Sequence, residues 1–219
     1  MANYSFTEEN YIKAIYHLQS SKTTVTTNEL AEVLKTKPAS VTDMIKKLKR
    51  KKLVNYKPYY GCGLTGNGRS LALLIIRRHR LWEYFLHEKL GFAWDEVHDV
   101  AEELEHVGSV KLINKLDAFL GFPRVDPHGD PIPEADGTVA EIQYSYLADA
   151  DINTTATIAQ IKQQSPALLD ILKQKKISIG SIITVLRKFD FDSSMEIKVT
   201  KYTVHITKEL AENILIKNL

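Results

Sequence analysis

Histidine and carboxylate side chains recur at close spacing between residues 98 and 106, a pattern that could bind a metal ion. His98, Glu102, Glu105 and His106 alternate with apolar residues at roughly helical spacing. On a helix these four polar residues would share one side. Two carboxylates beside two imidazoles repel one another unless a cation neutralises them, and this donor set suits a divalent first-row metal such as manganese or iron. The alternative is a solvated acidic helix face.

A second pair of possible ligands precedes this stretch. His79 and Glu83 are four residues apart within an apolar segment, about Gly68 to Leu90, that is predicted to be helical. They should therefore lie on one face of that helix. A lone pair of this kind is more often a surface contact than a metal site, so it gains meaning only beside the 98–106 pattern.

Composition places the chain among soluble globular proteins with room for more than one domain. It has 219 residues, of which 44% are hydrophobic and 26% are charged. The densest apolar run, residues 71–76, is too short to span a bilayer, and the first residues lack a secretion-signal pattern. A single cysteine, Cys62, excludes an internal disulfide and fits a reducing compartment. We therefore expect a cytoplasmic protein without a membrane partner.

Charge is distributed unevenly along the chain. Residues 1–75 hold 12 Lys and Arg against 5 Asp and Glu, a balance of +7, whereas the remainder holds 17 against 22, a balance of −5. A basic first third favours a polyanion as its partner. The alternative is an ordinary solvated face.

The order of elements in the first third is typical of a winged helix-turn-helix. Thr7 and Thr26 are candidate caps for two helices, and Pro38 stands near the start of a third. Two strand-like segments, near residues 53–56 and 62–65, flank a turn and predict a hairpin, after which Thr65 caps the next helix. Small polar residues at the exposed start of the third helix fit base recognition in DNA.

The rest of the chain divides into a helical middle and a C-terminal part rich in strands. Apolar helices at about 95–106 and 110–120 need a partner surface, which suggests a two-fold dimer. A proline-rich connector, residues 121–133, can be neither helix nor central strand. Short strands from about residue 139 onwards surround a helix near 165–175 and predict a small barrel, with a last helix near 210–216.

These pieces, in their order, resemble the metal-dependent transcriptional repressors of the diphtheria toxin repressor and manganese transport regulator family. The resemblance runs nearly from end to end. The motifs that carry it are Tyr11-Ile12-Lys13-Ala14-Ile15-Tyr16, Pro38-Ala39-Ser40-Val41-Thr42, Leu64-Thr65 with Gly68-Arg69, Arg78-His79-Arg80-Leu81 with Glu83, His98 with Glu102, Glu105 and His106, and Pro127-His128-Gly129-Asp130-Pro131-Ile132-Pro133. It implies a mainly helical fold with some β structure: a winged helix-turn-helix domain over 1–70, a helical dimerisation and metal-binding domain over 71–137, and an SH3-like barrel over 138–219.

The resemblance also implies two metal positions in each subunit. The primary position would use Asn10, Glu102, Glu105 and His106. The ancillary position would use His79, Glu83 and His98, completed from the barrel, where a loose alignment points to Gln160 and Gln163. Asp126 and His128 in the connector are a competing pair, because this loop supplies ligands in some manganese-type relatives.

Two departures from the family pattern bear on the metal. Relatives carry Met or Asp at position 10, where this chain has Asn10, and Cys or Glu at position 102, where it has Glu102. An oxygen-rich site with one negative charge fewer favours Mn(II), closely followed by Fe(II), with weaker affinity than an aspartate would give. Zn(II), Co(II) or Ni(II) are expected to bind in vitro, because their intrinsic affinities exceed that of Mn(II).

The implied activity is metal-activated binding of a homodimer to palindromic operator DNA, which represses genes of metal homeostasis. The residues expected to face DNA lie on the third helix and in the hairpin: Lys37, Pro38, Ala39, Ser40, Thr42, Lys46, Lys47, Lys57, Tyr59 and Tyr60. We expect no enzymatic activity and no small-molecule substrate. The competing hypotheses are a metal-independent winged-helix regulator and a zinc hydrolase, since Glu102-Glu103-Leu104-Glu105-His106 lies one residue from a peptidase motif.

Overall fold

The computed structural model describes residues 4–20 and 22–218, which form two compact units. One unit comprises residues up to 79 together with 102–116 and 133–138. The other comprises 80–101, 117–132 and 139 onwards. The boundary falls within three helices, α4 (Gly66–Leu90), α5 (Val97–Leu104) and α6 (Val110–Phe119), so that each unit takes part of all three. Among the described residues, no helix is both long and apolar enough to cross a membrane.

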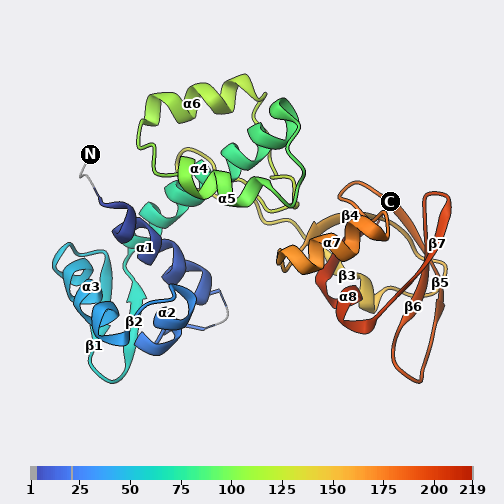
Figure 1. The fold of residues 1–219 in the computed structure, drawn as a ribbon, viewed down its shortest axis with the longest axis horizontal. Helices are drawn as coiled ribbons and strands as arrows, with labels where there is room; N and C mark the ends of the chain where they lie inside the picture. The colour runs from blue at the N-terminus through green and yellow to red at the C-terminus, as the bar shows by residue number, and fades with distance from the viewer. Residues whose placement is uncertain (1–3, 21, 219) are drawn as a thin grey trace. The chain divides into compact units, whose positions relative to one another are not determined.

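The first unit begins with three helices, α1 (Phe6–Leu18), α2 (Thr27–Val33) and α3 (Pro38–Arg50), drawn in blue in Figure 1. Ser5 caps α1 in a capping box with Glu8, so the expected cap at Thr7 was wrong by two residues. Thr26 caps α2 in the same way, as predicted. α2 and α3 pack against each other as a helix-turn-helix, and Pro38 is the first residue of α3.

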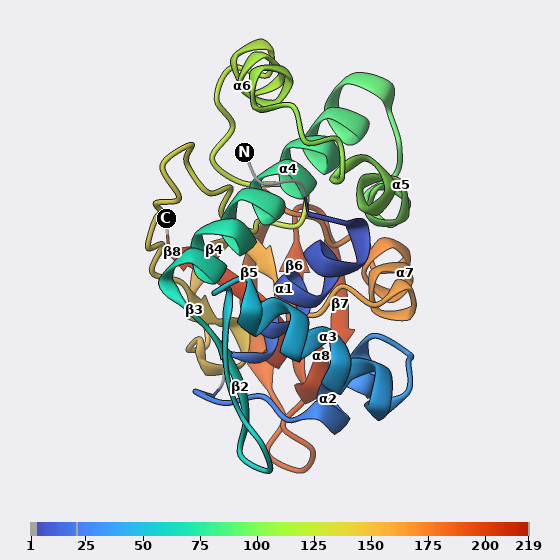
Figure 2. The same cartoon turned by 90° about the vertical axis from the view of Figure 1, so that its left-hand side faces the viewer.

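A short hairpin completes the winged helix. Strands β1 (Val54–Lys57) and β2 (Gly61–Leu64) pair antiparallel, and Figure 2 shows them as a narrow projection. Gly61 has a φ of +105°, and a Cβ there would lie 2.5 Å from the carbonyl oxygen of Val25, so only glycine fits. The apolar core that holds hairpin and helices together is drawn entirely from residues 11–75, with Ile12, Ile45 and Leu48 fully buried.

The helices that follow carry most of the expected metal ligands. α4 starts directly after Thr65, whose hydroxyl oxygen accepts a hydrogen bond from the Gly68 amide, as predicted. α5 ends at Leu104, so Glu105 and His106 lie in the turn that follows it. The expectation that all four residues from 98 to 106 share one helix was therefore wrong at its end. α6 (Val110–Phe119) comes next.

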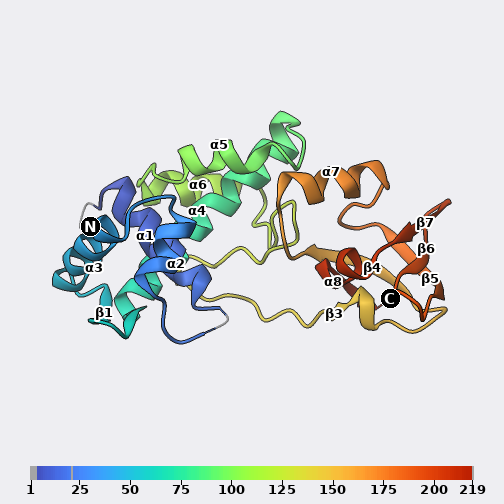
Figure 3. The ribbon, with the colours of Figure 1, turned by 60° about the horizontal axis from the view of Figure 1, so that its bottom comes forward.

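The second unit is built on a six-stranded antiparallel sheet of order β3-β8-β4-β5-β6-β7. Its strands are β3 (Ser145–Tyr146), β4 (Thr155–Ile161), β5 (Ile182–Lys188), β6 (Met195–Val199), β7 (Tyr202–Ile206) and β8 (Ile214–Asn218). Figure 3 shows α7 (Pro166–Gln174) and the short α8 (Lys208–Asn213) beside the strands, and a 3-10 turn, η1 (Leu147–Asp149), follows β3. The predicted last helix thus ends at Asn213, and a strand that was not predicted follows it.

The proline-rich connector is ordered by backbone contacts, as its composition indicated. Residues Val125 and Pro131 form an isolated β-bridge, and the Gly129 amide donates to the carbonyl oxygen of Asp126 at 3.1 Å. The Ile161 amide of β4 donates to the carbonyl oxygen of His128 at 3.0 Å. The connector is thereby fixed to β4 at the point where His128 and Asp126 turn inward.

Candidate metal centre

A buried acidic cluster in the first unit joins α1 to the end of α5. It contains Lys13 on α1, His79 on α4, Glu102 on α5 and Glu105 in the following turn, and is called the primary cluster below. The Lys13 Nζ donates to Glu102 Oε1 at 2.5 Å and to both carboxylate oxygens of Glu105 at 2.8 Å. The His79 Nδ1 lies 2.7 Å from Glu105 Oε2. The carboxylates at the centre of the expected primary site therefore surround a cation.

Glu105 is the most buried member of this cluster, since its side chain is 0% exposed. Burial alone would raise the pKa of its carboxyl group. The hydrogen bond from His79 and the charge of Lys13 outweigh burial and hold the pKa below its usual range. Glu105 is thus an ionised carboxylate in a place shielded from water, where only a positive charge can balance it.

Of the other two expected primary ligands, Asn10 is half-buried and the His106 side chain is buried. The amide oxygen of Asn10 is buried and has no hydrogen-bond partner among the described residues. The His106 Nδ1 lies 2.8 Å from Glu9 Oε2, and a carboxylate can only accept, so this nitrogen carries a proton. In the neutral tautomer with that proton, the His106 Nε2 presents a lone pair, and it lies 3.9 Å from Glu105 Oε1. Both atoms are donors to which a metal ion could bind.

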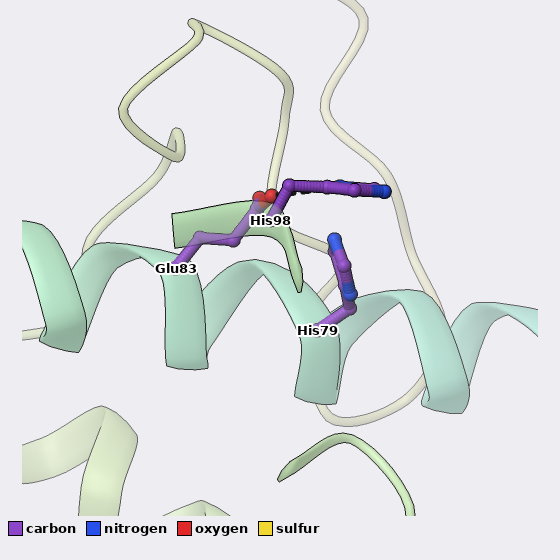
Figure 4. Close-up of side chains that lie close together, drawn as sticks. All are labelled: His79, Glu83 and His98. Atoms are coloured by element: carbon purple, nitrogen blue, oxygen red, sulfur yellow. Dashed lines mark hydrogen bonds and ion pairs between the residues drawn. The ribbon is translucent and has the colours of Figure 1, made fainter. Parts of the chain in front are cut away.

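A second cluster, consisting of Glu83, Asp126 and His128, lies in the second unit. All three side chains are buried, and they offer ligand atoms within 4.8 Å of one another. His98 lies beside it, with its Nδ1 3.4 Å from Glu83 Oε1. Figure 4 shows His79 and Glu83 on neighbouring turns of α4 with His98 above them, and the three residues offer ligand atoms within 4.8 Å of one another. The expected contact between Glu83 and His98 is present, and the connector adds Asp126 and His128.

Arg80 supplies positive charge to one side of this second cluster, since its Nε lies 3.5 Å from Asp126 Oδ2, and the hydrogen bonds of His128 define the other side. The His128 Nε2 lies 2.8 Å from the carbonyl oxygen of Trp94 and must donate to it, so the proton is on that nitrogen. The His128 Nδ1 is buried without a hydrogen-bond partner among the described residues and lies 4.0 Å from oxygens of both Glu83 and Asp126. Burial and the neighbouring Asp130 and Glu83 carboxylates raise the pKa of Asp126 well above its usual range. Three groups with lone pairs therefore converge on one buried point.

The two glutamines expected from the barrel are placed differently. The Gln160 amide nitrogen donates to Asp130 Oδ1 at 2.6 Å, and Gln164 donates to Asp130 Oδ2 at 2.6 Å. Gln163 is exposed, because β4 ends at Ile161 and the chain turns away. Neither expected glutamine contacts Glu83, Asp126 or His128 through a described hydrogen bond, so the connector pair is the better supported of the two alternatives.

The residues expected to face DNA are mostly exposed on α3 and the hairpin. Exposed members are Lys37, Pro38, Ala39, Ser40, Lys46, Lys47, Lys57, Tyr59 and Tyr60. Thr42 is half-buried, and its hydroxyl donates to the carbonyl oxygen of Pro38 in its own helix. Lys47 lies 3.3 Å from Glu8, so its charge is partly engaged within the domain. The Lys57 ammonium lies over the Tyr60 ring, 3.9 Å from its centroid.

Three residues of these clusters were not predicted from the sequence. Lys13 follows Asn10 by one helical turn, and that spacing is the signal that could have identified it. Glu9, which is bound by Arg78 at 2.8 Å and orients His106, has no comparable signal because its partners are distant in sequence. Asp130, which accepts from Gln160 and Gln164, belongs to the connector motif.

Comparisons with known proteins match each part of this architecture. Residues 4–62 match the model of the iron-dependent repressor N-terminal DNA-binding domain, residues 65–134 that of its metal-binding and dimerisation domain, and residues 146–218 that of the FeoA domain. A solved manganese-dependent transcriptional repressor in complex with manganese is 37% identical, with a TM-score of 0.86, over 97% of this chain and 100% of that one. The chain belongs to the iron-dependent repressor family. It is accordingly a metal-dependent DNA-binding regulator of transcription, and its predicted fold class is confirmed.

Characterised relatives within the family include regulators of both metal types. The iron-dependent repressor IdeR of Mycobacterium tuberculosis is 28% identical over 197 residues, which cover 90% of this chain and 84% of that protein. The transcriptional regulator MntR of Oceanobacillus iheyensis is 33% identical over 118 residues, or 54% of this chain and 80% of that protein. A structure of ScaR with bound Cd²⁺ is 29% identical over 97% of this chain and 99% of that one, with a TM-score of 0.78. Family membership alone therefore leaves the choice between manganese and iron to the ligands of this chain.

Proposed function

We propose that this family member is a repressor activated by Mn(II) or Fe(II), which binds palindromic operator DNA as a homodimer and controls genes of metal homeostasis. The primary cluster is the observation that carries the proposal. It places two carboxylates, Glu102 and Glu105, against α1 of the DNA-binding domain, and those carboxylates already hold a cation in the form of the Lys13 ammonium. A region that binds one cation so closely is chemically suited to another.

The primary metal would be held by Asn10, Glu102, Glu105 and His106. The fit rests on the unpartnered buried oxygen of Asn10, the ionised Glu105 and the free lone pair of His106 Nε2. Glu9 and His106 form the carboxylate–imidazole arrangement that commonly orients a metal-binding histidine. Three oxygen donors and one nitrogen favour Mn(II) or Fe(II) over softer ions, while Zn(II), Co(II) and Ni(II) would compete in vitro by intrinsic affinity.

The ancillary metal would be held by Glu83, Asp126 and His128, with His98 as a neighbouring donor. The lone pair of His128 Nδ1 faces the oxygens of Glu83 and Asp126, and a cation would balance this arrangement. His79, which was also expected here, offers a ligand atom within 4.8 Å of those of Glu83 and His98, and its Nδ1 also contacts Glu105. Gln160 and Gln163 are assigned no metal in this proposal.

The proposed switch follows from which elements the primary cluster joins. A bound divalent ion would supply positive charge that neutralises Glu102 and Glu105. The ion would then join Asn10 to the residues at the end of α5. This link would fix α1 relative to α5 and the turn that follows it. Metal binding would favour the arrangement of the protein that can bind DNA. The free energy by which metal strengthens DNA binding would then equal the difference in metal-binding free energy between that arrangement and the others.

DNA would be contacted by α3 and by the hairpin. Lys37, Ser40 and Thr42 at the start of α3 would approach bases, beside Pro38 and Ala39. Lys46, Lys57, Tyr59 and Tyr60 would approach phosphates. Lys47 would do so only in competition with its contact to Glu8. The regulator would act where the DNA is, in the cytoplasm, and we assign it no catalytic role.

Metal-dependent DNA binding by the full-length protein tests the proposal. Fluorescence anisotropy with DNA from upstream of its own gene, titrated with manganese, iron(II) and zinc, should show binding that requires metal. Glu105→Ala should abolish this activation, whereas Glu103→Ala, which alters an exposed carboxylate two residues away, should not. Tight sequence-specific binding in the presence of a chelator would instead establish a metal-independent regulator.

A further inference from the structure

Lys13 is placed on the two carboxylates that the proposed function assigns to the primary metal. Its ammonium contacts three carboxylate oxygens, one from Glu102 and two from Glu105, at 2.5 to 2.8 Å. The Lys13 side chain is only 13% exposed and that of Glu105 is 0% exposed, whereas that of Glu102 is 35% exposed. These are short, charge-assisted bonds in a place with little water, and so they are stronger than a surface ion pair.

The ammonium also explains how the protein can be folded before metal arrives. Two ionised carboxylates brought together under cover would repel each other, and an unpaired buried charge is strongly destabilising. Lys13 removes that penalty because it supplies one positive charge at the point of closest approach. It reaches this point from the same side of α1 as Asn10, one helical turn away.

The same placement sets Lys13 against any incoming metal. We propose that Lys13 is an intramolecular competitor of the activating metal ion: its ammonium occupies Glu102 and Glu105 in the metal-free protein and must leave them before they can bind a divalent cation. An ammonium ion and a metal ion cannot share the same carboxylate oxygens at contact distance, since two cations there repel each other. Lys13 therefore raises the metal concentration at which the repressor switches.

The route by which Lys13 leaves is present in the structure. A lysine has a four-carbon stem with rotatable bonds and a strongly hydrated head group. Because the Lys13 side chain retains some exposure, its ammonium can turn towards water without movement of α1. The alternative is a purely structural ion pair that stays in place when metal binds, and in that case Lys13 would support metal binding indirectly instead of opposing it.

Manganese binding in the absence of DNA separates these two roles. This inference rests on the proposed primary site. In a titration, that site is identified as the Mn²⁺ binding that the wild type shows and Glu105→Gln lacks. Electron paramagnetic resonance of free Mn²⁺ during titration of the full-length protein gives its dissociation constant. For Lys13→Met we expect that constant to fall by about tenfold or more, where tenfold corresponds to about 1.4 kcal/mol. Lys22→Met is the matched control, because Lys22 pairs with Glu29 in the same domain away from the cluster, and it should bind like the wild type.

Stability provides a second readout. Without metal, Lys13→Met removes the ammonium that Glu102 and Glu105 share and should melt at a lower temperature than the wild type. Added Mn²⁺ should raise its melting temperature more than that of the wild type, because tighter binding to the native state stabilises it more. Lys13→Gln, whose amide can still donate to one carboxylate, should fold without metal and shift manganese affinity in the same direction.

The possible failures are distinguishable. Unchanged or weaker manganese binding by Lys13→Met and Lys13→Gln would overturn the competitor role and leave the proposed function standing. If Glu105→Gln removed no binding class from the wild type, the primary site itself would be misplaced, whatever the lysine variants showed.

Discussion

Asn10 sets the charge of the primary cluster by contributing an uncharged oxygen. The side chains around the proposed metal carry two carboxylates, Glu102 and Glu105, and in the metal-free protein the Lys13 ammonium offsets one of them. An aspartate at position 10 would restore a second uncompensated negative charge. The amide therefore keeps the metal-free cluster closer to neutrality at the expense of metal affinity.

Asn10→Asp should accordingly tighten manganese activation. The concentration of Mn(II) that gives half-maximal DNA binding should fall by roughly fivefold to tenfold, as expected for one added charge near a partly screened cation. The metal-free variant should also be less stable, because three carboxylates then share one lysine. Asn28→Asp, an exposed change on α2 with the same chemistry, should alter neither property. If Asn10→Asp needed a higher Mn(II) concentration than the wild type for half-maximal DNA binding, position 10 would not face the metal.

At this scale the sequence singled out the candidate ligands better than their surroundings. Spacing selected His98, Glu102, Glu105 and His106 as one cluster, and the family resemblance divided them between two expected sites. The Lys13 and Glu9 contacts were not predicted, because they depend on how α1 packs against residues more than 85 positions away in the chain. Periodicity reports which residues share a face of one helix and carries no information about which other helix that face meets.

Among the elements, α1 is joined to α3 by ion pairs between the buried Glu8 carboxylate and two partly exposed lysines. The Glu8 carboxylate accepts from the Ser5 amide at 2.9 Å and lies 3.3 Å from Lys47 and 2.6 Å from Lys51. Burial raises its pKa, but the bonds from Lys51, Ser5 and Lys47 outweigh burial and lower the pKa to about 2 from its ordinary 4.5. The Glu8 carboxylate therefore belongs to the capping box of α1 and also contacts lysines of α3 and its C-terminal end.

Removal of this charge should destabilise the winged helix in a pH-dependent way. Because the folded pKa lies below the unfolded one, the contribution of Glu8 is complete above about pH 4.5 and is lost as the pH falls towards 2. Glu8→Gln should lower the free energy of unfolding near pH 7 by on the order of 2 kcal/mol, allowing for the partly exposed lysines. Denaturant titrations followed by circular dichroism should show this difference shrink below pH 4. Glu32→Gln, an exposed change, should show no such trend.

Lys46 is the exposed lysine of α3 best placed to contact a phosphate. Its side chain is 58% exposed, and its ion pair with Asp43 is long at 3.8 Å. Lys46→Ala should weaken binding to all DNA sequences alike and lower the slope of log affinity against log salt by about one. Anisotropy titrations over a salt series measure both quantities. Lys201→Ala, in the turn between β6 and β7, is the control, and a loss confined to one sequence would contradict the phosphate assignment.

The final elements show where sequence patterns stop being sufficient. Residues 210–216 contain closely spaced apolar residues, which predicted a helix, but the helix ends at Asn213 and β8 follows. Short apolar runs fit helix and strand equally well. The choice is made by pairing: Ile214 and Ile216 are buried between β3 and β4, whose residues lie 50 or more positions earlier. The caps at Thr26 and Thr65 were predictable because each acts within a few residues.

For the whole molecule, α6 is the element whose surface calls for a partner chain. It buries Ile113 and Leu116 but leaves Val110, Leu112 and Phe119 exposed by 41% to 66%. Apolar area of this kind is stabilised by association, and the matching family domain is one of dimerisation.

The protein should therefore sediment as a dimer at micromolar concentration, and Leu112→Glu should convert it to a monomer. A buried charge without a partner at the interface opposes association strongly. Ile171→Glu, which places the same charge at an exposed isoleucine of α7, should leave the dimer intact. Sedimentation velocity measures both variants, and a monomeric wild type with metal present would contradict this assignment of α6.

Strand β8 gives the chain a particular order of assembly as it leaves the ribosome. β8 follows every other described element in sequence, yet it lies inside the sheet between β3 and β4. The core of the winged helix is complete once residue 75 has emerged, whereas the barrel core draws on residues 147 to 216. A nascent chain thus carries a packed DNA-binding module while β3 and β4 still lack their shared neighbour. Unpaired strand edges can pair with the wrong strand or with another chain. We therefore expect this protein to need a chaperone most in the interval before residues 214–218 emerge.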